Sequence, residues 1–169
     1  MEVDSFKYLS RLVTRYYKLA QVQMELPIPW TPLSKPLSQS CFGLVTSGGL
    51  YHRGHDQPFD TAGEQKKPDW GDPSYRVLPA VMDPAEVGVS HLHLKENSIV
   101  EDMNILLPLQ RFRELAQEGR VQGQAEHAYS FMGYQGFPAD LSGWREESGP
   151  QVAQKLLAER VDNVLLTAA

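Results

Sequence analysis

Apolar residues recur at two different spacings along the chain, and each spacing predicts its own kind of element. Short β-favouring apolar runs at 41–46 and 161–167 predict buried strands, and Ala125–Met132 predicts another strand. Between Ser5 and about Gln23, apolar residues instead return every three or four positions, which predicts an amphipathic helix: Phe6, Leu9, Leu12, Val13, Tyr16, Leu19 and Ala20.

Two further helices are marked by their terminal residues. Pro108 suits the start of a helix and Gly119 its C-terminal cap, with an apolar stripe at Leu109, Phe112, Leu115 and Ala116. Ser148, Pro150 and Gln151 form a capping-box start for the second helix, whose inward side chains are Val152, Leu156 and Leu157. Strands that alternate with helices predict an α/β fold, with a mainly parallel sheet flanked by helices in a Rossmann- or flavodoxin-like three-layer arrangement.

The whole chain is interpreted as one α/β domain that spans residues 1–169. After the helical region at 1–25, four prolines in 26–40 predict an extended connector, and 41–169 form the sheet core. Residues 51–85 are polar and rich in glycine, proline and aspartate, which predicts a long functional or disordered loop. Ser90–Leu94 is expected to form a short strand.

Charge and cysteine content narrow the classes of function. The net charge of −5 argues against a nucleic-acid binder or a membrane-surface protein. There is no apolar run long enough to suggest a membrane span and no signal-peptide pattern at the start, so a cytoplasmic protein is expected. Cys41 is the only cysteine, which excludes an internal disulfide and a cysteine-based zinc site; it is interpreted as structural.

Two loop segments carry groups that suit a carboxylate or another anion. Ser47, Gly48 and Gly49 follow a predicted strand, where exposed backbone N–H groups can hold an anion, although a tight turn with positive φ explains the same glycines. Arg76, in Gly71-Asp-Pro-Ser-Tyr-Arg76, can clamp a carboxylate or instead form a surface ion pair, and Tyr75 can simply pack.

The histidines offer proton-transfer or metal-binding groups. His91 and His93 would lie on one face of a strand, where both rings can meet one substrate or metal, with Asp102 and Asn104 as further ligands or orienting groups. Two loop histidines bonded to backbone or solvent are the alternative. His127 fits a general base or a buried structural histidine. Ser47 or Ser130 could belong to a hydrolytic triad, but no Gly-x-Ser-x-Gly elbow occurs.

Eight short motifs follow one another in a fixed order between residues 41 and 167: Leu44–Tyr51, Gln57–Asp60, Gly71–Arg76, Ser90–His93, Asp102–Pro108, Arg113–Gly119, Tyr129–Gly133 and Val161–Thr167. This ordered set resembles the selenoprotein B family of glycine, sarcosine, betaine and D-proline reductases. The N-terminal helix with Trp30-Thr-Pro-Leu33 is also similar to the short members of that family.

The resemblance implies reductive cleavage of a C–N bond in an amino-acid-like substrate by a selenolate or thiolate nucleophile. It implies partner subunits, some bearing a pyruvoyl group, and thiol proteins that return electrons. A homo-oligomer of this chain is also compatible with it. On this hypothesis the catalytic residues are His91, His93, Asp102 and His127. The substrate-binding residues are Ser47, Gly48, Gly49, Asp60, Asp72, Tyr75, Arg76, Asn104, Ser130 and Thr167.

The family places its redox residue just after the strand that resembles Val161–Thr167, so selenocysteine or cysteine is expected just after Ala169. The hypothesis is an in-frame UGA codon at that point, with the sheet's final helix and strand absent from the 169 residues and this form inactive. A non-catalytic binding or scaffold subunit is the alternative. A metal-dependent hydrolase that uses His91, His93 and Asp102 is the third.

Overall fold

The structure is a computed structural model that describes residues 7, 9–19, 31–91, 94, 99 and 101–168. The chain divides into two compact units, residues 1–32 and 33–169, and each is described by itself.

The first unit contains helix α1 (Arg11–Leu19). The helix begins there because the Ser10 hydroxyl accepts a hydrogen bond from the Val13 N–H, which is the role of an N-cap. Leu9 and Ser10 are not helical, so within the described residues the predicted helix is confirmed from Arg11 to Leu19.

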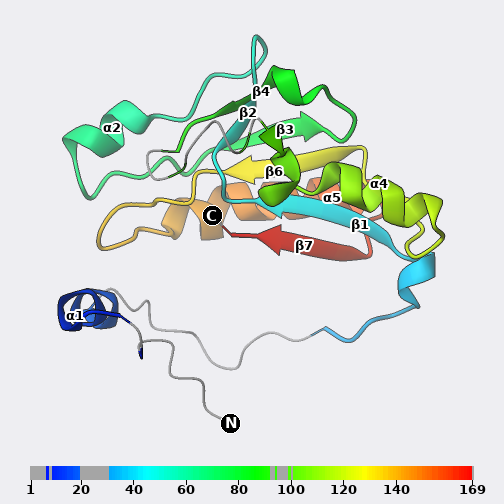
Figure 1. Cartoon of the computed structure of the whole chain (residues 1–169), viewed down its shortest axis with the longest axis horizontal. Helices are drawn as coiled ribbons and strands as arrows, with labels where there is room; N and C mark the ends of the chain where they lie inside the picture. The colour runs from blue at the N-terminus through cyan, green and yellow to red at the C-terminus, as the bar shows by residue number, and fades with distance from the viewer. Residues whose placement is uncertain are drawn as a thin grey trace. The chain divides into compact units, whose positions relative to one another are not determined.

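The second unit is built on a mixed sheet with β1 (Cys41–Thr46) at its centre. On one side β1 pairs in parallel with β5 (Gly123–Gln124) and β6 (His127–Phe131), and on the other with β7 (Asn163–Thr167). Figure 1 shows β6 and β7 on opposite sides of β1. Strand β3 (Tyr75–Pro79) is antiparallel to β6. The expected α/β fold is therefore confirmed, with one antiparallel strand in the sheet.

Helices pack on both faces of this sheet. Helix α4 (Leu109–Gln117) lies over the face that carries Leu44, Leu78 and Leu165, in the larger apolar cluster. Helix α5 (Gly149–Ala158) covers the opposite face, where Val152 and Leu156 pack with Tyr129. Adjacent strand residues point to opposite faces, so Leu44 and Val45 contribute to different clusters.

The segment 51–85 contains helices and strands, so its prediction as a long loop is wrong. It contains the end of β2 (Leu50–His52), α2 (Thr61–Lys66), β3 and a 3-10 turn at Pro84–Glu86. Strand β2 pairs with β4 (Val87–Val89), and β3 pairs with β6. Polar segments can form strands when distant strands supply hydrogen bonds, and local composition does not record such partners.

Three other predictions differ in part from the structure. Strand β4 ends at Val89, and the described residues of the predicted strand Ser90–Leu94 are not in a strand. Helix α5 begins at Gly149, directly after Ser148 as predicted, but the capping box is absent. Residues 142–158 are helical throughout, with a π-helical turn at Trp144–Ser148, and the Ser148 hydroxyl donates to the Gly143 carbonyl at 3.2 Å.

Strand β7 is the third case, since it is half-exposed rather than buried: the exposed fractions of Val164 and Leu166 are 45% and 73%. None of the described helices is long and apolar enough to cross a bilayer.

Candidate functional site

A pocket of about 320 Å³ opens at the carboxyl ends of β1, β6 and β7, on the face that α5 covers. In an α/β sheet, the carboxyl ends of the strands are where ligand sites form. The lining residues come from three strand ends and the helical segment: Val45, Thr46, Ser47, Phe131, Trp144, Gly149, Leu166, Thr167 and Ala168. Ser47 and Thr167, both predicted to bind substrate, therefore share one pocket.

Two hydroxyl groups of this lining are engaged within the protein. The Thr46 hydroxyl oxygen accepts a hydrogen bond from the Gly48 N–H at 3.1 Å. The Thr167 hydroxyl lies between the carbonyl oxygens of Val45 and Leu106, to which it donates. Most of the wall that remains is apolar, so the pocket suits a small molecule with hydrophobic groups.

The backbone donors of the glycine turn are also used internally. Ser47 N–H donates to the Thr167 carbonyl at 3.0 Å, and Gly49 N–H donates to the Phe131 carbonyl at 2.8 Å. Gly49 has φ +65°, and a Cβ atom there would lie 2.5 Å from the Ser90 carbonyl oxygen. The expectation of exposed N–H groups is therefore wrong, and the positive φ that the alternative of a tight turn requires is present at Gly49.

His91 lies beside this turn. A Cβ atom on Gly49 would be 3.5 Å from the Cβ of His91, and the Ser90 N–H donates to the Gly49 carbonyl. His93 lies outside the described residues, so the pairing of the two rings stays a prediction. Of the predicted catalytic residues that the structure describes, His91 is the one placed next to Ser47–Gly49.

His127 occupies the opposite end of β6. Its Nδ1 lies 2.8 Å from Glu159 Oε1, and its backbone N–H donates to Glu159 Oε2 at 3.2 Å. Phe131 of the pocket lies four positions further along the strand, a distance of about 13 Å. Burial, followed by the charge and hydrogen bond of Glu159, raises the pKa of the adjacent Tyr129 to about 12. These contacts fit a structural histidine.

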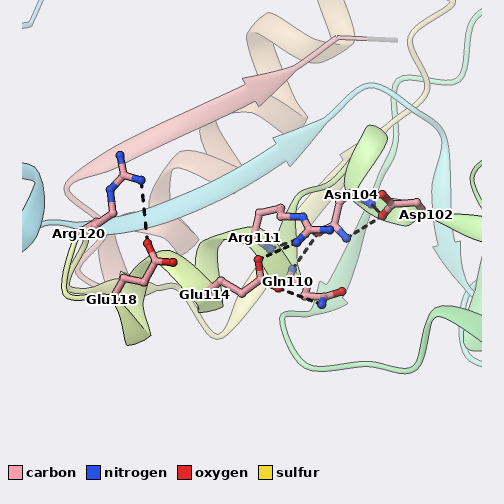
Figure 2. A network of polar contacts seen from close by, with 7 residues as sticks. All are labelled: Asp102, Asn104, Gln110, Arg111, Glu114, Glu118 and Arg120. Carbon is pink, nitrogen blue, oxygen red and sulfur yellow. Dashed lines mark hydrogen bonds and ion pairs between the residues drawn. The ribbon is translucent and has the colours of Figure 1, made fainter.

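Asp102 and Asn104 hold the start of α4 (Figure 2). The Asn104 side-chain oxygen accepts from the Gln110 and Arg111 N–H groups at 3.1 and 3.4 Å. Asn104 in turn donates its side-chain and backbone N–H groups to Asp102, and these hydrogen bonds lower the pKa of the Asp102 carboxyl. Among the described residues, no three histidine, cysteine, aspartate or glutamate side chains gather as a metal site.

Arg76 binds the segment that precedes α2. Its Nε donates to the Gln57 carbonyl at 2.7 Å, Nη2 donates to the Pro58 carbonyl at 3.3 Å, and its Cζ lies 4.0 Å from the centre of the Phe59 ring. Its Nη1 donates to the Ser74 hydroxyl and the Tyr75 carbonyl. These bonds occupy most of the guanidinium donors, so a bidentate clamp on a substrate carboxylate is not available in this conformation.

Three other predicted binding residues also have structural contacts in this region. Asp60 caps α2, since its Oδ1 accepts from the Gly63 N–H at 2.8 Å. Burial opposes the ionisation of Asp72, but hydrogen bonds from Ser74 and Asp60, with the charge of Arg76, lower its pKa overall. Tyr75 packs on Tyr129 and Phe131.

Ser130 and Cys41 have structural surroundings. Ser130 is fully buried, and its hydroxyl oxygen accepts the Leu50 N–H at 2.7 Å. Burial and the nearby carboxylates of Asp162 and Glu159 raise the pKa of the Cys41 thiol, which disfavours the thiolate.

Sequence reasoning missed the aromatic residues of the pocket. Phe131 and Trp144 have ring centres 5.6 Å apart at an interplanar angle of 72°. Phe131 is the last residue of β6, so its position at a strand end was the available signal. Trp144 lies in the π-helical turn, ahead of the predicted helix start, and no local pattern points to it.

Comparison with known proteins yields a family and two curated relatives. The profile of the glycine/sarcosine/betaine reductase selenoprotein B family matches residues 14–169. The D-proline reductase subunit gamma of Acetoanaerobium sticklandii is 35% identical over 153 residues, which cover 87% of this chain and 58% of that protein. The glycine reductase complex component B subunit gamma of Carboxydothermus hydrogenoformans is 25% identical over 142 residues, which cover 83% of this chain and 31% of that protein.

The chain thus spans 58% and 31% of the lengths of these two relatives. No solved structure matches the chain with significance. The match to the family profile extends over most of the sequence, including every strand of the sheet. The chain therefore belongs to the glycine/sarcosine/betaine reductase selenoprotein B family.

Proposed function

We propose that this chain forms the substrate-binding α/β part of a reductase subunit that cleaves the C–N bond of an amino-acid-like substrate. The observation that carries the proposal is the pocket at the carboxyl ends of β1, β6 and β7, in a chain that belongs to this family. Both relatives are named as gamma subunits of reductases, which supports partner subunits for this chain as well.

The reacting group of the proposed site is a selenocysteine or cysteine that follows Ala169, by resemblance to the family. When present, it supplies a selenolate or thiolate that forms a bond to the substrate α-carbon while the C–N bond breaks and its electron pair leaves with the amine. Two thiols of a donor then become a disulfide and supply two electrons that break the new bond to the α-carbon; the carbon takes up a proton, and the selenolate or thiolate is regenerated. The described lining carries no carboxylate, so no fixed negative charge there opposes an anionic nucleophile.

The residues of this chain have binding and shielding roles in the proposal. Val45, Leu166 and the two aromatic rings exclude water from the reacting carbon, which strengthens the electrostatic interactions inside the pocket. Ser47, at the end of β1, is the lining residue placed to contact a polar group of the substrate. His91, beside the glycine turn, is the candidate to give the leaving amine its proton.

The nucleotide sequence after codon 169 and a reconstitution assay test the proposal together. An in-frame UGA followed by coding sequence supports it, whereas UAA or UAG with no coding sequence beyond contradicts a nucleophile in this chain. The protein encoded by the reading frame that continues through the UGA, with selenocysteine inserted, is then mixed with partner subunits and a dithiol. Cleavage of the C–N bond is measured as amine release from glycine, sarcosine and betaine, and as ring opening for D-proline, whose nitrogen stays attached to the product.

Cleavage of the C–N bond by the selenocysteine form, seen as amine release or ring opening, and none by the 169-residue form, is the expected result. Cleavage by the 169-residue form would overturn the assigned nucleophile. Ligand binding without cleavage in either form would favour a non-catalytic binding subunit instead.

A further inference from the structure

The two aromatic rings at the pocket form a corner rather than a stack. The Phe131 and Trp144 ring planes meet at 72° with their centres 5.6 Å apart, an edge-to-face arrangement. Val45 and Leu166 add aliphatic surface to the same wall. None of the described residues that line the pocket carries a formal charge.

An uncharged aromatic corner discriminates between kinds of ammonium group. A primary ammonium has three N–H donors that need acceptors, and burying them without partners costs free energy. An alkylated ammonium spreads its charge over methyl or methylene groups, has few or no N–H donors, and is attracted by the faces of aromatic rings. The lining therefore favours an alkylated amine over a primary one.

Trp144 is held in place by a special backbone turn. The π-helical turn Trp144–Ser148 includes the hydrogen bond from the Ser148 hydroxyl to the Gly143 carbonyl. A Cβ atom on Gly149 would lie 2.4 Å from the Trp144 carbonyl oxygen, so only glycine fits beside this turn without movement. Such single π turns in helices are frequent at functional sites.

The indole ring of Trp144 also has a buried N–H group, at Nε1, without a hydrogen-bond partner among the described residues, which lowers the stability of the protein in a way that packing does not explain. An unsatisfied buried donor is destabilising, and a phenylalanine would fill similar space without one. Tryptophan, however, gives the strongest cation–π attraction of the aromatic side chains, which is a reason for its presence at this wall.

We propose that Trp144, with Phe131, is a specificity-determining residue that selects substrates whose amine is alkylated, such as a trimethylammonium carboxylate, over those with a primary amine. This inference rests on the proposed function for its meaning as substrate selection. The binding preference itself is independent of any redox chemistry.

Calorimetric binding to the 169-residue chain tests the preference with three probes: glycine betaine, glycine, and 3,3-dimethylbutanoate, in which carbon replaces the charged nitrogen of betaine. We expect betaine to bind more tightly than both other probes. Trp144→Leu should weaken betaine binding about tenfold, and Trp144→Phe less, because the cation–π attraction is lost or reduced. Trp70→Leu, the same change at an exposed tryptophan outside the lining, should leave it unchanged.

Equal binding of betaine and 3,3-dimethylbutanoate would overturn the role of the aromatic rings, as would tighter binding of glycine or unchanged binding by a folded Trp144→Leu protein. If none of the three probes bound, the inference would also be overturned. Circular dichroism establishes that each variant is folded, and Trp144→Phe provides a second variant if Trp144→Leu is not. Selective betaine binding without amine release by the reconstituted selenocysteine form would contradict the proposed function and leave this inference standing.

Discussion

Gly43, in the middle of β1, lies directly against Leu156 of α5: a Cβ atom on Gly43 would be 2.5 Å from Leu156 Cδ2 and 3.1 Å from Val161 Cγ1. Helix α5 can approach the sheet this closely because the strand has no side chain at that point. The helix carries part of the pocket lining at Gly149, so the contact bears on the site as well as the core.

Gly43→Ala should destabilise the protein by about 1–3 kcal/mol, because the added methyl group overfills a packed interface. The measurement is the free energy of unfolding from denaturant titration. Gly123→Ala is the matched control, since Gly123 lies in β5 and has no atom within 4 Å of its Cβ position. Equal stability of the Gly43→Ala and wild-type proteins would contradict the close packing of α5 on β1.

Asn104→Ala should destabilise the protein by about 1 kcal/mol, because two backbone N–H groups at the start of α4 lose their acceptor. Gln110→Ala is the control, because it keeps both backbone N–H groups and their acceptor. It removes only an exposed side-chain hydrogen bond to Glu114, seen in Figure 2, so the free energy of unfolding should change by no more than about 0.5 kcal/mol. Thermal unfolding measures both. A loss of ligand binding in Asn104→Ala at unchanged stability would instead support its predicted role in substrate binding.

Asp72→Asn should lower stability at pH 7 by about 1 kcal/mol, since the ionised carboxylate accepts hydrogen bonds from Asp60 and Ser74 but is partly exposed and screened. The folded pKa is lowered, and the unfolded value is about 3.9. The stabilisation is therefore present above about pH 4 and is lost as the pH falls through the folded pKa.

The difference between wild type and Asp72→Asn should therefore be largest near neutral pH and shrink in acid. Denaturant unfolding at about pH 7, 5 and 3 measures it. Asp69→Asn, the same change at an exposed carboxylate three residues earlier, should give a smaller difference at pH 7. A difference that grows as the pH falls would contradict the assigned contacts.

Tyr129→Phe should remove part of the loss of stability in alkali. Burial and the nearby Glu159 carboxylate raise the folded pKa of Tyr129 to about 12, above the ordinary value of 10.0. The folded state therefore keeps its proton when the unfolded state has lost it, so stability falls as the pH rises from about 10 to 12. Unfolding between about pH 9 and 11.5 should show a shallower decline for Tyr129→Phe, and parallel curves would contradict the buried, carboxylate-facing hydroxyl.

The elements that were predictable are those whose signals are local. Strand β1 is a short apolar run followed by glycines, and α4 has Pro108 before its first residue and Gly119, with φ +70°, after its end. Strand β3 was missed because its partner is distant: Arg76 is paired with Ser130, 54 positions away in the sequence. Composition reports neither the partner nor the register of such a pair.

The candidate site was predictable only at its strand ends. Ser47 and Thr167 follow β1 and complete β7, and a parallel sheet brings such positions to one edge. Trp144 reaches the same pocket from a helical segment that begins before the capping pattern at Ser148, so the local sequence did not predict its place in the pocket. His127 shows the reverse case, a residue that suits catalysis but whose strand position turns it toward Glu159.

The π-helical turn at Trp144–Ser148 has a consequence for how this helix tolerates changes in length. In a regular α-helix, the loss of one residue rotates every following side chain by about 100°. A π turn holds one residue more than an α turn, so a deletion within 144–148 can convert it to regular helix while Val152 and Leu156 keep facing the sheet. The wall of the pocket can therefore gain or lose a residue without repacking the core beneath it.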